Sequence, residues 1–133
     1  MLGAMIFVLV LLFSSGTTQV ADEAVVYELK AIGQSIYEYH ETMGQWPRNI
    51  DDLNRTSLPV RVRYWKPSIE SGSFVVVWNQ HLNPNPQDNR DAVLAYHNRG
   101  TLAMFGHQWV CWGDLRTEYV SSKTLHAALA GTH

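Results

Sequence analysis

The chain of 133 residues contains one cysteine, so no disulfide can form within it. Motifs that bind nucleotides or metals, or that carry a catalytic serine, are absent as well: GxGxxG, GxxxxGKS/T, GxSxG, HExxH and CxxC. Basic charge is scarce, because the formal net charge is −2 and no positive field attracts nucleic acid. We therefore predict a non-enzymatic protein without cofactor or metal, which does not bind nucleic acid and depends on its hydrophobic core.

A hydrophobic run long enough to cross a membrane is missing too. Met1 to Phe13 is almost entirely apolar, but these thirteen residues fall short of the ~20 that a membrane-spanning helix needs. Small and polar residues follow up to Gln19, as in a secretory signal peptide, although no Lys or Arg precedes the run. We expect residues 1–21 to be a signal peptide or an N-terminal membrane segment, with cleavage after Gly16 or Ala21.

The expected location is therefore secreted, periplasmic or in the cell envelope, with membrane contact only through residues 1–21 if they are retained. Residues 22–133 are expected to form a single globular domain. A content of 46% hydrophobic and 11% aromatic residues over the whole chain suits a folded core.

The clearest secondary-structure signal is an amphipathic helix that ends near Met43. Its apolar residues recur at alternating spacings of four and three, which places one set on a single face: Val25, Leu29, Ile32, Ile36, Tyr39 and Met43. The opposite face is expected to carry Glu28, Lys30, Ser35, Glu38 and Glu41. Asp22 and Glu23 suit the first turn, where the helix dipole favours negative charge. Gly44 suits the C′ position, and Pro47 prevents the helix from continuing.

The segments that follow the helix carry turn and strand signals. Asn49 is expected to cap a short helical turn at 50–53. The alternation of apolar and other residues from Val60 to Trp65 predicts a half-buried strand. Phe74 to Trp78 is continuously apolar, which predicts a central strand buried on both faces.

Antiparallel strands and a final helix are predicted after a loop at 79–89. The strands are expected at 91–96, 101–105, 109–112 and 115–120, with turns at 98–100 and at Gly113-Asp114. Ser121 or Ser122 is expected to cap the helix, whose apolar side is Leu125, Ala128 and Leu129. The order predicts an α+β fold, in which a long N-terminal amphipathic helix packs on an antiparallel sheet and a short helix ends the chain.

The stretch LKAIGQSIYEYHETMGQWP resembles the segment of bacterial pilin-like proteins in which the N-terminal helix ends and the globular head begins. The residues that carry the resemblance are Leu29, Lys30, Ile32, Gly33, Tyr39, His40, Gly44, Trp46 and Pro47. The relatives are type II secretion pseudopilins and other pilin-like proteins. In these relatives, a strand ending near a His leads to an apolar strand, an Asp-Gly turn and a final amphipathic strand, which resembles residues 96–120 here. The resemblance implies a pilin-like fold, a structural or interaction role linked to type II secretion, and pilin-like or secretion-system proteins as partners.

The extreme N-terminus departs from the pattern of fibre-forming pilins. Those proteins carry a processing Gly, an aromatic residue and a Glu four residues on, ahead of a longer apolar run. Here Gly3 is followed by Ala4-Met5-Ile6-Phe7, and no acidic residue occurs before Asp22. We therefore expect a pilin-like head that is exported on its own, rather than a subunit of a filament.

Two constellations offer an alternative, enzymatic or metal-binding function. His97 and His107 could face each other across a sheet with Asp114 nearby, which would supply metal ligands. Cys111, His107 and Asp114 are the residue types of a thiol nucleophile, a base and an orienting acid. However, Cys111 and His107 would lie roughly 13 Å apart on a strand. The alternative function is a small secreted hydrolase or metal-binding protein that uses His97, His107 and Asp114.

Five tryptophans are many for a chain of this length. Most are expected in the core, where their large apolar surface stabilises the fold. Trp65 or Trp112 could instead line a binding face for a protein or a glycan. Cys111, inside the apolar sequence WVCW, is expected to be a buried small hydrophobic residue.

Overall fold

The computed structural model describes the backbone of residues 2–53, 59–98 and 106–131, and the side chains of 22–53, 65–98 and 106–131. It is an α+β fold with an antiparallel sheet, as predicted, and the sheet has four strands within these described residues. In chain order the elements are α1 (Leu2–Met43), α2 (Ile50–Leu53), α3 (Pro59–Glu70), β1 (Phe74–Val76), η1 (Pro86–Asn89), β2 (Val93–His97), β3 (His107–Trp112), β4 (Thr117–Ser121) and α4 (Ser122–Ala130).

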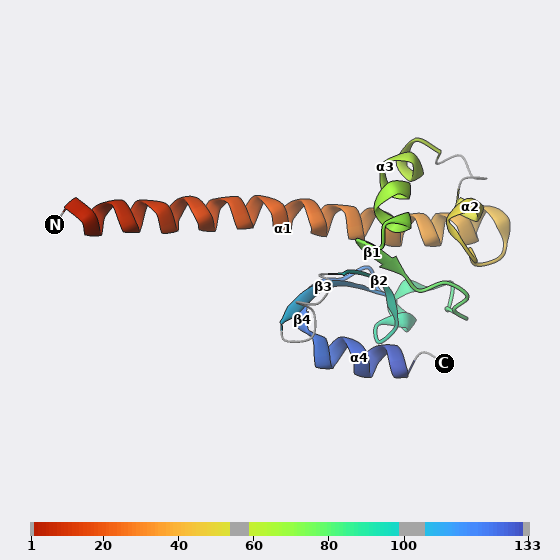
Figure 1. The fold of residues 1–133 in the computed structure, drawn as a ribbon. Coiled ribbons are helices and arrows are strands. Elements are labelled where there is room, and N and C mark those ends of the chain that lie inside the picture. The colour runs from red at the N-terminus through yellow and green to blue at the C-terminus, as the bar shows by residue number, and fades with distance from the viewer. Residues whose placement is uncertain (1, 54–58, 99–105, 132–133) are drawn as a thin grey trace.

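The sheet is a meander in which each strand pairs with the next one along the chain. Ala95 lies opposite Cys111 in the β2–β3 pair, and Val110 lies opposite Glu118 in the β3–β4 pair. Helix α1 crosses one face of this sheet, while α4 lies on the other face (Figure 1). Both faces of the sheet are therefore partly covered by helices.

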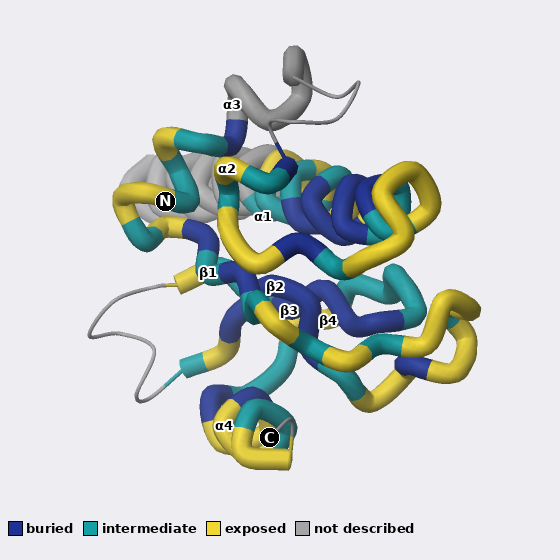
Figure 2. The backbone as a smooth tube through the Cα atoms, turned by 90° about the vertical axis from the view of Figure 1, so that its right-hand side faces the viewer, coloured by how far each residue is buried: buried dark blue, intermediate teal, exposed yellow. Residues whose placement is uncertain are grey.

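The predicted apolar stripe of α1 is confirmed by its burial. Leu29, Ile32, Ile36 and Tyr39 all belong to one buried cluster, together with the strand residues Leu94, Ala95 and Cys111. Figure 2 shows that buried residues gather where α1 meets β2 and β3. Because these side chains leave water together, their burial is the main stabilising contribution that links the helix to the sheet.

The polar side of α1 was predicted less well than the apolar stripe. Ser35 was expected on the exposed face, but it is fully buried and its hydroxyl donates to the Ala31 carbonyl at 2.9 Å. That bond satisfies a polar group that would otherwise be costly to bury. Met43, expected in the stripe, is 43% exposed because it occupies the last turn of the helix, beyond the sheet.

The two ends of α1 differ in how well they were predicted. Asp22 and Glu23 do not lie in its first turn, because the helix begins at Leu2. Gly44 is the C′ residue as predicted: its φ is +75°, and its amide donates to the His40 carbonyl at 2.8 Å. This bond and the left-handed backbone are the features of a helix end at glycine.

Among the residues whose side chains are described, no helix combines the length and apolar character needed to cross a membrane.

The predicted strand from Val60 to Trp65 is wrong, because this segment belongs to helix α3. Pro59 occupies the first helical position, where its fixed φ and missing amide proton are tolerated. Trp65 and Ile69, four residues apart, both pack against the core that contains α1. The spacing of these two anchors is helical, whereas the alternation before them is equally compatible with a strand.

The predicted central strand at Phe74 to Trp78 is also wrong in its position. β1 covers only Phe74–Val76 and lies at the edge of the sheet, paired with β2 alone. Phe74 and Val76 of β1 are buried in the cluster that contains α1, while Val77, just after the strand, is partly buried against the cluster that contains Leu125 of α4. A continuous apolar run therefore indicates that both faces of the strand are packed against other parts of the protein. It does not indicate that the strand has a neighbouring strand on each side.

Most of the remaining elements are confirmed. Asn49 caps α2 by accepting the Asp52 amide at 2.9 Å, and Ser121 caps α4 by accepting the Thr124 amide at 3.2 Å. Leu125 is buried against the sheet, and it is flanked by the partly buried Ala128 and Leu129. The predicted turn at 98–100 and strand at 101–105 fall on or extend into residues 99–105, which lie outside the described part of the chain.

Candidate functional site

The histidines and the carboxylate considered for a metal site lie at different ends of the sheet. His97 ends β2 and His107 begins β3, whereas Asp114 occupies the turn at the far end of β3. No group of three or more His, Cys, Asp or Glu that could hold a metal ion occurs among the residues with described side chains. The arrangement of His97, His107 and Asp114 expected for the alternative function is therefore not assembled.

The thiol constellation is not assembled either. Cys111 is fully buried in the α1–sheet core, and burial raises the pKa of its thiol to about 12. His107 is four residues away at the other end of β3, on the exposed surface, where its ring stacks on Tyr119 at 5.4 Å. A protonated thiol that neither a base nor a substrate can reach is no nucleophile. The prediction that Cys111 acts as a buried hydrophobic residue is confirmed.

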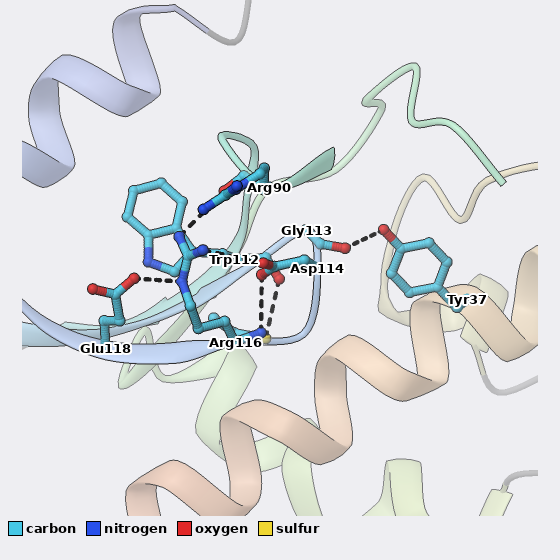
Figure 3. A network of polar contacts seen from close by, with 8 residues as sticks. Tyr37, Arg90, Trp112, Gly113, Asp114, Arg116 and Glu118 are labelled. Atoms are coloured by element: carbon cyan, nitrogen blue, oxygen red, sulfur yellow. Dashed lines mark hydrogen bonds and ion pairs between the residues drawn. The ribbon is translucent and has the colours of Figure 1, made fainter. Parts of the chain in front are cut away.

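Asp114 is engaged by a neighbouring arginine. One of its carboxylate oxygens accepts the Arg116 guanidinium at 3.1 Å, and the other accepts the Arg116 amide at 3.1 Å (Figure 3). The same guanidinium contacts Glu118 at 2.5 Å and lies 5.5 Å from the centre of the Trp112 ring. Arg116 thus links the turn and β4 of the β3–β4 hairpin, and the carboxylate of Asp114 stabilises the turn through its bonds to Arg116.

The two tryptophans proposed for a binding face do not form one. Trp65 is 5% exposed and Trp112 is 7% exposed, so both are core residues. The large hydrophobic side chains that are exposed among the described residues are Tyr27, Met43 and Tyr119. Tyr119 lies beside Trp109, with 5.2 Å between the two ring centres.

A polar junction joins α1 to the sheet hairpin and to the loop between β1 and β2. The Tyr37 hydroxyl on α1 donates to the Gly113 carbonyl in the β3–β4 turn (Figure 3). It also accepts the side-chain amide of Asn89 at 2.8 Å. Burial raises the pKa of Tyr37, while the hydrogen bond from Asn89 acts in the opposite direction. Three segments that are distant in the sequence are therefore held by one phenol group.

The end of α1 carries a second cluster, built from residues of the segment Leu29 to Pro47. The Trp46 ring stacks on the His40 ring, with 3.9 Å between the ring centres, and meets the Tyr37 ring edge-on, with 5.5 Å between the centres. Pro47 next to it is buried. The chain leaving α1 is thus folded back onto the last helical turns, which fixes where the globular part begins.

A cleft of about 530 Å³ lies between the loop that joins β1 to β2 and the C-terminal end of α4. It is lined by residues 79–82 and 88–92 and by Gly131. This size falls within the range of small-molecule sites, roughly 300–1,000 Å³. Sequence reasoning predicted only a loop here. The sequence signal in this region is its density of Asn, Asp, Gln and His, residues that can bind a ligand but that also favour turns.

The chain matches no protein-family model, and comparisons with curated proteins and with solved structures give no match to it.

Proposed function

We propose that this chain is an exported pilin-like domain with a non-catalytic structural or interaction role at the cell envelope, linked to type II secretion. The proposal rests above all on one observation, the burial of the α1 stripe against an antiparallel sheet directly before the helix end at Gly44. This is the place where the stretch LKAIGQSIYEYHETMGQWP resembles the boundary between helix and head in pilin-like proteins.

Several of the residues that carry the resemblance have a structural role in this protein. Ile32 and Tyr39 are buried under the sheet, and Gly33 permits its close approach. Gly44 ends the helix with a left-handed backbone, and Trp46 closes the junction over His40. Residues that together build one junction between helix and globular part support a fold shared with pilin-like proteins better than scattered identical residues do.

The order of the remaining elements also supports the proposal. β2 ends at His97, the apolar β3 follows, and the Gly113-Asp114 turn leads into β4. This is the sequence of elements expected from pilin-like relatives, with the turn residues in reversed order. The partners that follow from the proposal are other pilin-like proteins or components of a secretion system.

Export is tested on the full chain, produced in a bacterial cell with a C-terminal affinity tag. We expect a mature N-terminus between Thr17 and Asp22, read by mass spectrometry, and a protein that is soluble outside the cytoplasm without detergent. Leu11→Arg interrupts the apolar run and is expected to retain the uncleaved chain in the cytoplasm. Uncleaved wild-type chain in the cytoplasm would refute the proposal. Retention of Ile6 to Phe13 with membrane sedimentation would instead favour an anchored, pseudopilin-like form.

The interaction role is tested by placing a photo-crosslinking amino acid on the exported chain. Tyr27 is 75% exposed on α1, and Lys123 on α4 is an exposed position on the other side of the sheet. Crosslinking from position 27 to a pilin-like or secretion-system protein is the expected result, with position 123 as the comparison. If envelope fractions yield no crosslink to such proteins from either position, the proposed partners are wrong.

A further inference from the structure

The cleft beside the β1–β2 loop has no part in the function proposed above. Four exposed ionisable side chains line it: His81, Asp88, Arg90 and Asp91. These side chains make no hydrogen bond or ion pair within the described part of the chain. We propose that this cleft binds a neutral, hydroxyl-rich ligand, an oligosaccharide. The proposal is independent of export and of secretion.

The charges of the cleft exclude the simpler ligands. A metal ion needs several ligands around one point, and no such group of His, Cys, Asp or Glu occurs among the residues with described side chains. A phosphate or another anion would meet the carboxylates of Asp88 and Asp91, and Arg90 is the single opposing cation in the lining. A neutral ligand avoids both of these conflicts.

The hydrogen-bonding capacity of the cleft matches sugar hydroxyl groups. A hydroxyl group both donates and accepts, so it can donate to the carboxylates of Asp88 and Asp91 and accept from the Arg90 guanidinium. Bonds of this kind to charged groups are stronger than bonds between neutral groups. Leu82 and Ala92 supply apolar side chains in the lining, against which the C–H face of a sugar ring can pack.

The lining of the cleft is held in shape by hydrogen bonds that leave the four ionisable side chains free. The Gln80 amide donates to the carbonyls of Val77 at 3.1 Å and Val93 at 2.6 Å. The Asn89 amide donates to the Asn83 carbonyl at 2.7 Å, and its oxygen accepts the Asn83 amide at 2.9 Å. A loop ordered before binding loses less conformational entropy when a ligand is taken up.

The test follows backbone amide resonances of the full chain by NMR during titration with chitotetraose and, separately, maltotetraose. We expect at least one of these sugars to shift the amides of residues 79–82 and 88–92. The double variant Asp88→Asn, Asp91→Asn should bind that sugar about tenfold more weakly, because two charge-assisted hydrogen bonds are weakened. Glu23→Gln, Glu41→Gln carries the same change in charge at exposed positions of α1 and should bind like the wild type.

Three results would overturn the proposal. The first is the absence of shifts with both sugars at concentrations on the order of 10 mM. The second is a set of shifts that lies outside the cleft or persists unchanged in the Asp88→Asn, Asp91→Asn variant. The third is the same pattern of shifts with calcium chloride alone, which would assign the cleft to a cation. None of these results bears on export, which is read from the mature N-terminus and the cell fraction.

Discussion

Two glycines show how closely separate segments approach each other in this protein. A Cβ atom at Gly33 would lie 2.8 Å from the Cys111 sulfur and 3.0 Å from a Leu115 methyl carbon. A Cβ atom at Gly113 would lie 2.2 Å from the backbone oxygen of Asn89. In both places the missing side chain is what allows the contact, although alanine is the better residue within a helix such as α1.

The nature of the obstructing atom predicts the cost of each substitution. Gly33→Ala gains ~1 kcal/mol of helix propensity but overpacks buried side chains by ~1–3 kcal/mol, so we expect a net loss of about 1 kcal/mol. Gly113→Ala meets a backbone atom that cannot rotate away, and we expect a loss of about 3 kcal/mol or more. Urea unfolding followed by tryptophan fluorescence measures both values.

The control for this pair is Gln34→Ala, at an exposed position of the same helix, which should change stability by less than about 0.5 kcal/mol. Combining Gly33→Ala with Cys111→Ala should reduce the cost of the glycine substitution, because the nearest obstructing atom is removed. A stabilising Gly33→Ala would show that the sheet does not press on the helix at this position.

Among the elements, α1 is held by one face, and its two faces should respond differently to substitution. Ile32 is fully buried under the sheet, so Ile32→Ala should lower the free energy of unfolding by about 2–5 kcal/mol through lost contacts and a cavity. Glu41→Ala, on an exposed part of the same helix, should cost about 0.5 kcal/mol or less. The measurement is urea unfolding, and equal losses for the two variants would mean that the stripe is not the packing face.

The β3–β4 hairpin contains a residue with an unusual backbone. Leu115 has a φ of 70°, in the left-handed region that disfavours side chains, yet it packs against the α1 cluster. Burial of the leucine side chain therefore offsets the backbone strain in the turn.

This combination predicts that, at position 115, glycine is more stabilising than alanine, the reverse of their order within a helix. Both Leu115→Ala and Leu115→Gly remove the packing, but only glycine relieves the left-handed backbone, which costs alanine about 1–2 kcal/mol. We expect the glycine variant to be the more stable of the two, by about 1 kcal/mol in thermal or urea unfolding. The same comparison at the exposed helical position Gln34 should give the opposite order. Alanine more stable than glycine at position 115 would show that the turn is unstrained.

At the scale of the whole molecule, the sheet is covered by α1 on one face and by α4 on the other. The sole cysteine lies in the layer between α1 and the sheet. Burial raises the pKa of Cys111 from 9.0 to about 12, and burial also raises the pKa of Tyr96. The unfolded chain therefore releases these protons at a lower pH than the folded chain does, so alkaline solution favours unfolding.

Alkaline pH should therefore destabilise the protein through Cys111. The contribution of its protonated thiol is complete below pH 9 and is lost as the pH rises toward about 12. In that window the free energy of unfolding should fall by up to about 1.4 kcal/mol for each pH unit on account of this thiol. Urea unfolding at a series of pH values measures the slope, and Cys111→Ala should show a shallower one. Equal slopes would contradict the burial of the thiol in the folded chain.

Several parts of this structure could be predicted from local sequence patterns. The stripe from Leu29 to Tyr39, the helix end at Gly44, the Ser121 cap and the β3–β4 hairpin all follow from spacings and residue types within a few positions. Each of these features depends on residues that are close in the sequence. For that reason the α+β class could be predicted from the sequence.

Other features were decided only when distant segments packed together. The segment that contains α3 alternates like a strand, and it is a helix because Trp65 and Ile69 pack against α1. β1 is an edge strand that pairs with β2 alone, and its apolar residues Phe74 and Val76 are buried in the cluster that also contains residues of α1 and α3. His107 and Asp114 are close in sequence yet lie at opposite ends of β3, since an extended chain rises ~3.3 Å per residue. The cleft is lined by both the β1–β2 loop and the end of α4, an arrangement that no local spacing encodes.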